Sequence, residues 1–220
     1  MHTAGKVKGE KPDWFPDWSG ETAVIVASGP SATHVDLAQA KGKAKLITIN
    51  DSWRLAPWAD ALYAHDEAWW DVWSGVPSFN GLKISGQRTN PKWDVKLARI
   101  NKYRDEILVE PDGTIGWGSH GGFHALNLAI QFGARRIVLV GYDCRIDQGI
   151  NWHGGHQHGL PNKGIVCVTI WRKVLDMQAL LLKKLGVEVL NASPVSTLTA
   201  YQKVEFAAAV QGAEVRNVLA

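Results

Sequence analysis

The chain has 220 residues, of which 45% are hydrophobic and 20% are charged. This balance is typical of an ordinary globular protein, and the length suffices for one domain with a sizeable core. A formal net charge of +3 permits an anionic partner. The sequence contains no dense block of Lys and Arg, which dedicated nucleic-acid-binding proteins usually carry.

The two cysteines, Cys144 and Cys167, are too few for a secreted disulfide framework and form no CxxC pair. The N-terminal residues have no apolar core like that of a signal peptide, and no apolar run approaches the length of a membrane span. We therefore expect a cytoplasmic protein without a membrane span.

The first 20 residues are polar but contain Trp14, Phe15 and Trp18. They are interpreted as an N-terminal arm, residues 1–20, which packs these three aromatic rings onto the body of the protein. Residues 21–220 are predicted to form a single nucleotide-binding α/β domain.

The first half of this domain contains several apolar strands. Residues 22–28 form an uninterrupted apolar run, of the kind expected in a strand covered on both faces. A short helix over residues 32–42 follows, closed by Gly42. Further strands are predicted over residues 44–50, 60–66 and 81–87.

The second half alternates strands with longer helices. Phe123, Leu126, Ala129 and Ile130 recur at helical spacing and predict a helix over residues 121–134. The other elements predicted here are strands over 106–112, 135–143 and 187–194 and helices over 165–186 and 200–210. Such alternation favours one Rossmann-like domain, with an open, mostly parallel sheet and helices on both faces.

Polar residues follow five of the predicted strands. In open parallel sheets, ligands bind outside the carboxyl ends of the strands. A polar residue at one strand end is ordinary turn chemistry, but agreement across the sheet favours a site for a nucleotide or a similar anion. The strand ends are Gly29-Pro30-Ser31, Asn50-Asp51-Ser52, His65-Asp66, Tyr142-Asp143 and Asn191-Ala192-Ser193.

The turn Gly29-Pro30-Ser31 is typical of a strand leading directly into a helix. Glycine permits a positive φ and a close approach to the backbone, proline fixes φ for the first turn, and serine caps the helix or donates to an anion. Free N–H groups at a helix start suit a phosphate. The same tripeptide also fits a plain helix start, with no ligand.

The segment before residue 123 provides a second glycine-rich turn. It places several glycines, Gly121 among them, and Ser119 ahead of a helix start. Amides exposed in such a loop can receive an anionic or hydroxyl group. The alternative is a tight turn in which Ser119 or His120 caps the helix.

A glycine-rich loop contains three histidines in a span of six residues, His153, His156 and His158. Their spacing matches no standard zinc signature, so we predict no metal site. A histidine beside an anion site suits a general acid or base, because its pKa lies near neutrality. The sequence does not choose among the three, and a simple solvated loop is the alternative.

Five of the eleven tryptophans lie within residues 51–73, around His65 and Asp66. Most are expected in the core, and one or two at a strand end could stack on a base or a sugar.

The order of these motifs resembles the bacterial sialyltransferases of glycosyltransferase family 42. The resemblance spans residues 22–200. The sequence is equally similar to relatives of that fold, which include archaeal 6-hydroxymethylpterin diphosphokinase-like proteins and small phage-encoded proteins. It rests on the segments "GPS", "ITIN", "YAHDEAWW", "GSHGGFHALNLAIQFGARRIVLVGYD" and "VEVLNASPVSTL".

The resemblance implies a cytidine nucleotide bound by Gly29, Ser31 and Asn50, with Asp66 and Ser119 at the matching polar positions. It also implies a histidine base on the loop of residues 153–158. A CMP-sugar donor is implied, with no metal ion or other cofactor and an unidentified acceptor. Ser28 and Asp66 stand where the family has asparagine, and Tyr142 is the one clear counterpart of its tyrosine pair.

Three functional hypotheses follow. The first is a metal-independent glycosyltransferase whose nucleotide-sugar is bound by Gly29, Pro30, Ser31, Asn50, Asp66, Ser119, Gly121, Tyr142 and Asp143. The second is a phosphotransferase using ATP and Mg²⁺, with Asp66 and Asp143 as candidate ligands. The third is a non-catalytic nucleotide-binding protein. A homo-oligomer and a phage origin are further expectations.

Overall fold

The computed structural model describes residues 9–156 and 159–211. Three parts of the sequence predictions lie outside these residues. They are the candidate base His158, the first eight residues of the arm and the last nine residues of the domain.

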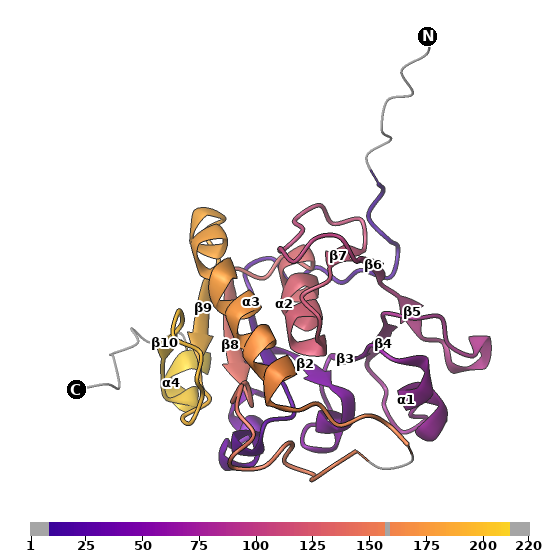
Figure 1. The fold of residues 1–220 in the computed structure, drawn as a ribbon. Helices are drawn as coiled ribbons and strands as arrows, with labels where there is room; N and C mark the ends of the chain where they lie inside the picture. The colour runs from indigo at the N-terminus through magenta and orange to yellow at the C-terminus, as the bar shows by residue number, and fades with distance from the viewer. Residues whose placement is uncertain (1–8, 157–158, 212–220) are drawn as a thin grey trace.

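The core of the fold is one sheet of eight strands in the order β10-β9-β8-β1-β2-β3-β4-β5 (Figure 1). Every pair of neighbouring strands in it is parallel, as in the pairing of Val24 with Leu46 of β2 and with Val138 of β8. The predicted open α/β fold is therefore confirmed. The strands are β1 Thr22–Val26, β2 Lys45–Ile49, β3 Ala61–Ala64, β4 Leu82–Ser85, β5 Lys96–Leu97, β8 Arg136–Val140, β9 Glu188–Asn191 and β10 Gln202–Lys203.

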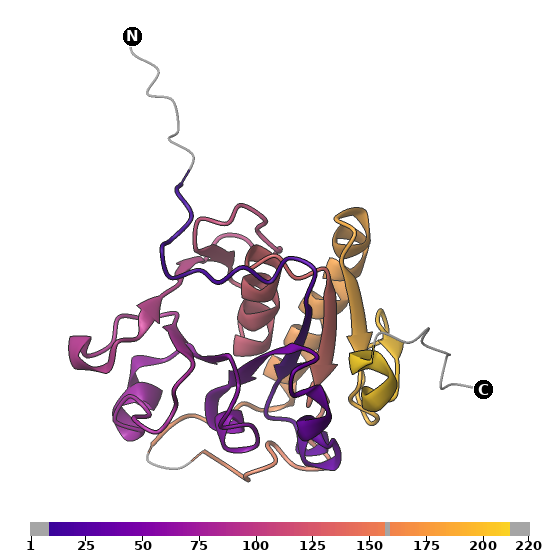
Figure 2. The same cartoon turned by 180° about the vertical axis from the view of Figure 1, so that it is seen from behind.

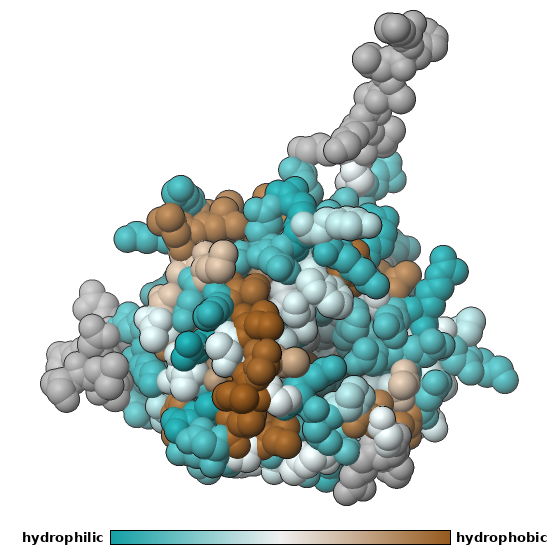
Figure 3. All heavy atoms as spheres, in the orientation of Figure 1, coloured by the Kyte–Doolittle hydropathy of each residue, from teal (hydrophilic) through white to brown (hydrophobic). Residues whose placement is uncertain are grey.

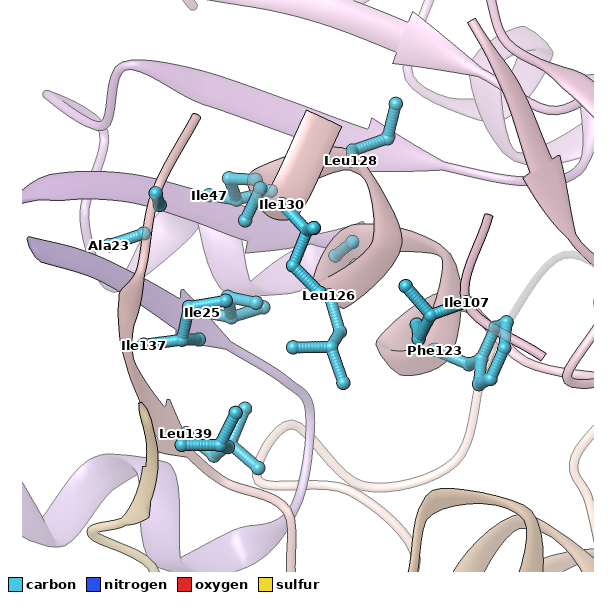
Figure 4. Close-up of a cluster of buried hydrophobic side chains, with 14 of the residues drawn as sticks. Ala23, Ile25, Ile47, Ile107, Phe123, Leu126, Leu128, Ile130, Ile137 and Leu139 are labelled. Atoms are coloured by element: carbon cyan, nitrogen blue, oxygen red, sulfur yellow. The ribbon is translucent and has the colours of Figure 1, made fainter. Parts of the chain in front are cut away.

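Both faces of the central strands are covered. Ala23 and Ile25 of β1 point to the face packed by Phe123 and Leu126 (Figure 4), which belong to helix α2, Gly121–Gln131. Helix α3, Ile165–Lys184, covers the same face further along the sheet. Burial on both sides explains why these strands are continuously apolar rather than alternating.

The opposite face is packed by shorter elements. Val24 and Val26 of β1 contact this second layer, which includes Trp70 and Phe206. It is formed by the 3₁₀ turns η1, Pro30–His34, and η2, Leu37–Ala40, and by helices α1, Glu67–Val72, and α4, Phe206–Val210 (Figure 2).

Two predicted elements differ in the structure. The helix expected over residues 32–42 is replaced by η1 and η2, because Val35 adopts an extended backbone and the Asp36 side chain caps a new turn by accepting from the Ala38 N–H. Serine, threonine and aspartate side chains compete in this way with helical backbone bonds. The helix expected over 200–210 is likewise shortened to α4, preceded by β10.

The prediction of a strand over residues 106–112 is wrong. The Ile107 N–H donates to Gln178 Oε1 at 3.1 Å, and the Leu108 N–H donates to Asn127 Oδ1 at 3.0 Å. Side-chain amides therefore satisfy the backbone groups that a neighbouring strand would otherwise pair. The pairing occurs nearby, between β6, Arg99–Asn101, and β7, Thr114–Gly116.

Aromatic residues of the N-terminal segment pack at the C-terminal end of α2. Phe15 and Trp18 each place their rings 4.9 Å from the Phe132 ring, centroid to centroid. Trp14 lies 4.6 Å from Phe15.

Helix α3 exposes a series of large apolar side chains, including Val166, Met177 and Leu180. Apolar atoms are visible along this side of the molecule in Figure 3. Within residues 9–156 and 159–211, no helix combines the length and apolar character needed to cross a membrane.

Candidate functional site

The topology opens a crevice at the carboxyl edge of the sheet. From β1 the chain proceeds outward through β2 to β5, and it later returns to place β8 on the other side of β1. The loops that follow β1 and β8 therefore diverge, and this switch point is where open α/β sheets bind ligands.

Two adjoining cavities lie along this edge, of about 380 Å³ and 170 Å³. We call them together the cleft. The two cavities join where several elements meet. These are the loops after β2 and β7, the start of α2, helix α3, and the loop between β8 and α3 that carries His153 and His156, which we call the histidine loop. The residues that line both are Asn50, His120, Gly121, His156 and Trp171.

Most of the predicted site residues line the cleft. Asp66 and Ser119 line the larger cavity. Gly29, Tyr142 and Asp143 line the smaller cavity. Pro30 and Ser31 line neither cavity.

The turn after β1 is closed by an internal carboxylate. The Ser31 N–H donates to Asp143 Oδ2 at 2.9 Å, and the Ser31 hydroxyl donates to Asp143 Oδ1. Both residues are buried, with exposed fractions of 1% and 2%. Asp143 thus occupies the position at which the Ser31 amide and hydroxyl could otherwise meet an external anion.

Of the two uses expected of Gly29, the structure shows the close approach to the backbone and not the positive φ. Its φ is −57°, which any residue can adopt. A Cβ at this position would lie 2.4 Å from the Gly141 carbonyl oxygen and 2.7 Å from the Asp143 carboxyl carbon. Glycine is needed because the turn passes directly against the end of β8.

Three residues of the cleft have left-handed backbone without being glycine. They are Asn50 with φ 48°, Ser119 with φ 63° and Cys144 with φ 51°. Such residues carry backbone strain, which concentrates at functional sites. Ser74, Val76 and Asp94 have the same backbone conformation outside the cleft, so the strain is not confined to it.

His120 is the N-cap of α2, one of the two residues predicted for that position. Its Nδ1 accepts from the Phe123 N–H at 3.3 Å, and its ring stacks on Trp171 at 5.2 Å between centroids. Burial lowers the pKa of His120 to about 3, so the ring is neutral at pH 7. Its Nε2 therefore carries the proton, yet it is buried with no hydrogen-bond partner among the described residues.

A chain of aromatic polar groups lies beneath the larger cavity. The Tyr63 hydroxyl donates to His124 Nδ1 at 2.8 Å, and His124 Nε2 donates to the Trp117 carbonyl oxygen at 2.5 Å. Burial lowers the pKa of His124 to about 3, and burial also raises the pKa of Tyr63. Burial lowers the pKa of the neighbouring His65 as well, against the opposing effect of Asp66.

The histidine loop is fixed to the sheet at its start. The Trp152 N–H donates to the Ser28 carbonyl oxygen at 2.9 Å, and Trp152 Nε1 donates to Ser52 Oγ at 3.2 Å. Of the two described candidate bases, His156 lines the cleft. His153 does not, and it lines an adjoining cavity of about 150 Å³ that His156 also reaches.

The tryptophans that follow β2 and β3 are largely structural. Trp70 is fully buried and donates to the Ala64 carbonyl oxygen at 3.1 Å. Trp69 and Trp73 both donate to Asp51 Oδ1, at 2.8 Å and 3.1 Å. Of these three, Trp69 also lines the larger cavity.

Sequence reasoning missed several residues of the cleft. His124 follows the cap residue His120 by one helical turn, a spacing that could have indicated a shared location. Trp171 and Lys102 had no such signal, because α3 and the segment after β6 reach the cleft only through the tertiary fold. Lys102 lies 5.9 Å from the Trp117 ring centroid.

The fold and the cleft define an open parallel α/β domain with a crevice at its switch point, an arrangement that commonly receives nucleotides. Comparison with solved structures finds the CstII sialyltransferase of Campylobacter jejuni in complex with cytidine-5'-monophosphate. The TM-score is 0.55 at 13% identity, over 82% of this chain and 83% of that chain.

Two further CstII structures match in the same way. One contains CMP-3FNeuAc, with a TM-score of 0.50, 12% identity and coverage of 81% of this chain and 84% of that chain. The other contains a trisaccharide acceptor and CMP, with a TM-score of 0.51, 14% identity and coverage of 81% and 83%. At such identities the likeness shows the fold alone.

No protein-family model matches the chain, and no curated protein matches it in sequence. The resemblances to pterin diphosphokinase-like and phage-encoded proteins stay predictions.

Proposed function

We propose that this protein is a nucleotide-sugar-dependent glycosyltransferase that needs no metal ion and uses His156 as its general base. The fold shared with sialyltransferases that bind CMP supports the class of reaction. One observation carries the choice of base. Of the two described candidate histidines, His156 is the one that lines both cavities of the cleft.

The nucleotide phosphate would lie where the two cavities join. The amides of Gly121 and Gly122 belong to the first turn of α2 and have no acceptor within the helix. Together with the positive end of the helix they favour an anion at this point. Lys102 and Lys163 on the larger cavity add positive charge, and Arg145 on the smaller cavity is paired with Asp147.

The remaining polar groups suit the neutral parts of a nucleotide-sugar. Asn50 lines both cavities and can exchange hydrogen bonds with ribose or base. Asp66 lines the larger cavity, where its carboxylate would accept from sugar hydroxyls rather than face phosphate. A CMP-sugar is the proposed donor, by the resemblance given above.

The transfer step is a displacement at the anomeric carbon. His156 accepts the proton of an acceptor hydroxyl, and the hydroxyl oxygen forms the new bond to the anomeric carbon. The bond from that carbon to the phosphate oxygen breaks, and the nucleoside monophosphate leaves with the electron pair. The amides at the start of α2 stabilise the charge that develops on the phosphate.

The phosphotransferase alternative has less support in the structure. Asp66 and Asp143 line different cavities, and both oxygens of Asp143 accept hydrogen bonds from Ser31. The two carboxylates therefore do not face each other across one cavity.

A panel of CMP-, UDP- and GDP-sugars tests the proposal, with binding measured by calorimetry and nucleotide release measured in buffer containing EDTA. We expect turnover of a CMP-sugar. We expect His156→Asn to lower kcat about 10²- to 10⁴-fold while CMP binding is retained. His34→Asn, at an exposed histidine outside the cleft, is the matched control and should leave both unchanged.

Each contrary result has a distinct meaning. Binding of CMP without turnover of any sugar would identify a non-catalytic nucleotide-binding protein. Consumption of ATP that requires Mg²⁺, without turnover of any nucleotide-sugar, would favour the phosphotransferase. The absence of binding and turnover with every nucleotide-sugar and with ATP and Mg²⁺ would exclude all three hypotheses.

A further inference from the structure

Asp51, His153 and His156 come together behind the cleft. Asp51 lies in the 3₁₀ turn η3, Asn50–Arg54, directly after β2, about a hundred residues before the two histidines. One ligand atom from each of the three side chains lies within 4.8 Å of the other two. The histidine spacing in the loop predicted no metal site because it could not include a carboxylate from another strand end.

The geometry of this group fits a tetrahedral ion. Asp51 Oδ2 lies 3.6 Å from His153 Nδ1. Ligand atoms about 2.1 Å from a tetrahedral zinc ion lie about 3.4 Å from one another. The rings of His153 and His156 are 5.1 Å apart between centroids.

The surroundings orient the ligands. Asp51 Oδ1 is held by the indole N–H groups of Trp69 and Trp73, which leaves Oδ2 directed at His153. Partners of this kind fix ligands at metal sites.

Burial holds the His153 ring in place. Its side chain is only 6% exposed, and its Nδ1 atom faces Asp51 Oδ2. Its Nε2 atom, on the far side of the ring, is buried without a hydrogen-bond partner among the described residues. The adjoining cavity of about 150 Å³ is lined by Asp51, His153 and His156 and leaves room for an ion with a water molecule.

We propose that Asp51, His153 and His156 form a binding site for a divalent transition-metal ion, zinc by its donor set. Two imidazoles and one carboxylate suit zinc, whereas magnesium prefers oxygen ligands in an octahedron. The Arg54 guanidinium lies 5.3 Å from the Trp152 ring and lines the same cavity. Its positive charge opposes the binding of a cation at this site.

A regulatory consequence rests on the function proposed above. When His156 donates a lone pair to zinc, its ring is held away from an acceptor hydroxyl. Zinc then inhibits the transfer reaction, although the reaction itself needs no metal.

Calorimetry of the full-length protein with ZnCl₂ tests the site without any assay of activity. After treatment with EDTA and dialysis, we expect one zinc ion per chain and no binding of MgCl₂. His153→Asn and Asp51→Asn should each weaken zinc binding about 100-fold or more, since changes in the supporting residues alone cost about 10- to 100-fold. His34→Asn, at the exposed histidine, should bind like the wild type.

Asp51→Asn keeps the shape of the side chain, and circular dichroism shows whether each variant folds. Failure of the wild type to bind zinc would overturn the proposal. Stoichiometric binding that survives both His153→Asn and Asp51→Asn would also overturn it, because the ion would then be held elsewhere, for example by Cys144 or Cys167.

The regulatory part has a separate readout. Zinc should lower the transfer rate of the wild type at least tenfold. The transfer rate of His153→Asn should be nearly the same with and without zinc. Zinc binding with unchanged turnover would support the metal site and exclude the inhibition. Zinc binding without turnover of any nucleotide-sugar would support the metal site and exclude the proposed function.

Discussion

At the scale of single residues, the buried bonds between Ser31 and Asp143 join the turn after β1 to the end of β8. The Asp143 carboxylate accepts from both the amide and the hydroxyl of Ser31. A carboxylate at such a position imitates the anion that the amide could otherwise bind. The two central strands are therefore held together at the floor of the cleft by a group that belongs to the protein itself.

Replacement of Asp143 by alanine leaves the Ser31 N–H and hydroxyl buried without an acceptor. We expect Asp143→Ala to lower the free energy of unfolding by about 3 kcal/mol, measured by urea denaturation. Asp147→Ala, which removes an exposed carboxylate paired with Arg145, should cause no measurable change. A stable Asp143→Ala variant that no longer binds CMP would instead assign Asp143 to the ligand.

The buried histidines give the stability a pH dependence. The pKa values of His120 and His124 fall from the ordinary 6.5 to about 3 in the folded protein. The unfolded chain therefore binds more protons between these values, and stability decreases as pH falls from about 6.5 toward 3. Above pH 6.5 both states are neutral at these residues and this effect is absent.

We expect each of the two histidines to contribute about 2 kcal/mol of this loss at pH 5. Comparison of urea denaturation at pH 7 and pH 5 measures it. His124→Gln should lose less stability than the wild type over this interval. His34→Gln, at the exposed histidine, should lose as much as the wild type. An equal loss in His124→Gln would show that His124 does not remain neutral in the folded protein.

At the scale of elements, α2 organises the segment that sequence analysis assigned to a strand. Asn127 is fully buried, and its Oδ1 accepts from the N–H groups of Leu108 and Gly116. Its Nδ2 donates to the Leu108 carbonyl oxygen at 2.7 Å. One side chain of the helix thus supplies bonds that a second strand would otherwise provide.

Asn127→Ala should lower the free energy of unfolding by about 3 kcal/mol, because the N–H groups of Leu108 and Gly116 lose their acceptor. The Leu108 carbonyl oxygen keeps Gln131 as a donor. Hydrogen exchange should become faster at Leu108 and Gly116. Asn90→Ala, which removes only an exposed cap of the 3₁₀ turn η4, Pro91–Trp93, is the control and should not change exchange there. Unchanged protection in Asn127→Ala would mean that the segment is held by other contacts.

At the scale of the whole molecule, the N-terminal segment is part of the packed body. Trp18 is 3% exposed, and its backbone N–H donates to the Phe132 carbonyl oxygen at 2.7 Å. Phe15 and Trp18 cover the end of α2, the helix whose other end forms the cleft.

Trp18→Ala should lower the free energy of unfolding by about 3–5 kcal/mol, the usual cost of removing a buried aromatic ring. Thermal denaturation should show a melting temperature lower by several degrees. Tyr103→Ala removes an aromatic ring that is 98% exposed and should leave the melting temperature unchanged. A small effect at Trp18 would mean that the segment is separable from the domain.

The sequence by itself determined the fold class and most of the cleft. Continuous apolar strands such as β1 and β8 form only where helices cover both faces, and the ends of parallel strands must meet at one edge. This reasoning places Gly29, Asn50 and Asp143 at one crevice, where the structure has them. It is local and periodic, so it could not say which hydrogen bonds a strand end makes.

The tertiary structure decided which polar groups face the cleft and which face each other. Asp143 meets Ser31 across 112 residues of sequence, and Asp51 meets His153 across about a hundred. Neither contact follows from spacing, because each depends on the order in which strands lie side by side. Trp171 entered the cleft for the same reason, through the packing of α3 against the sheet.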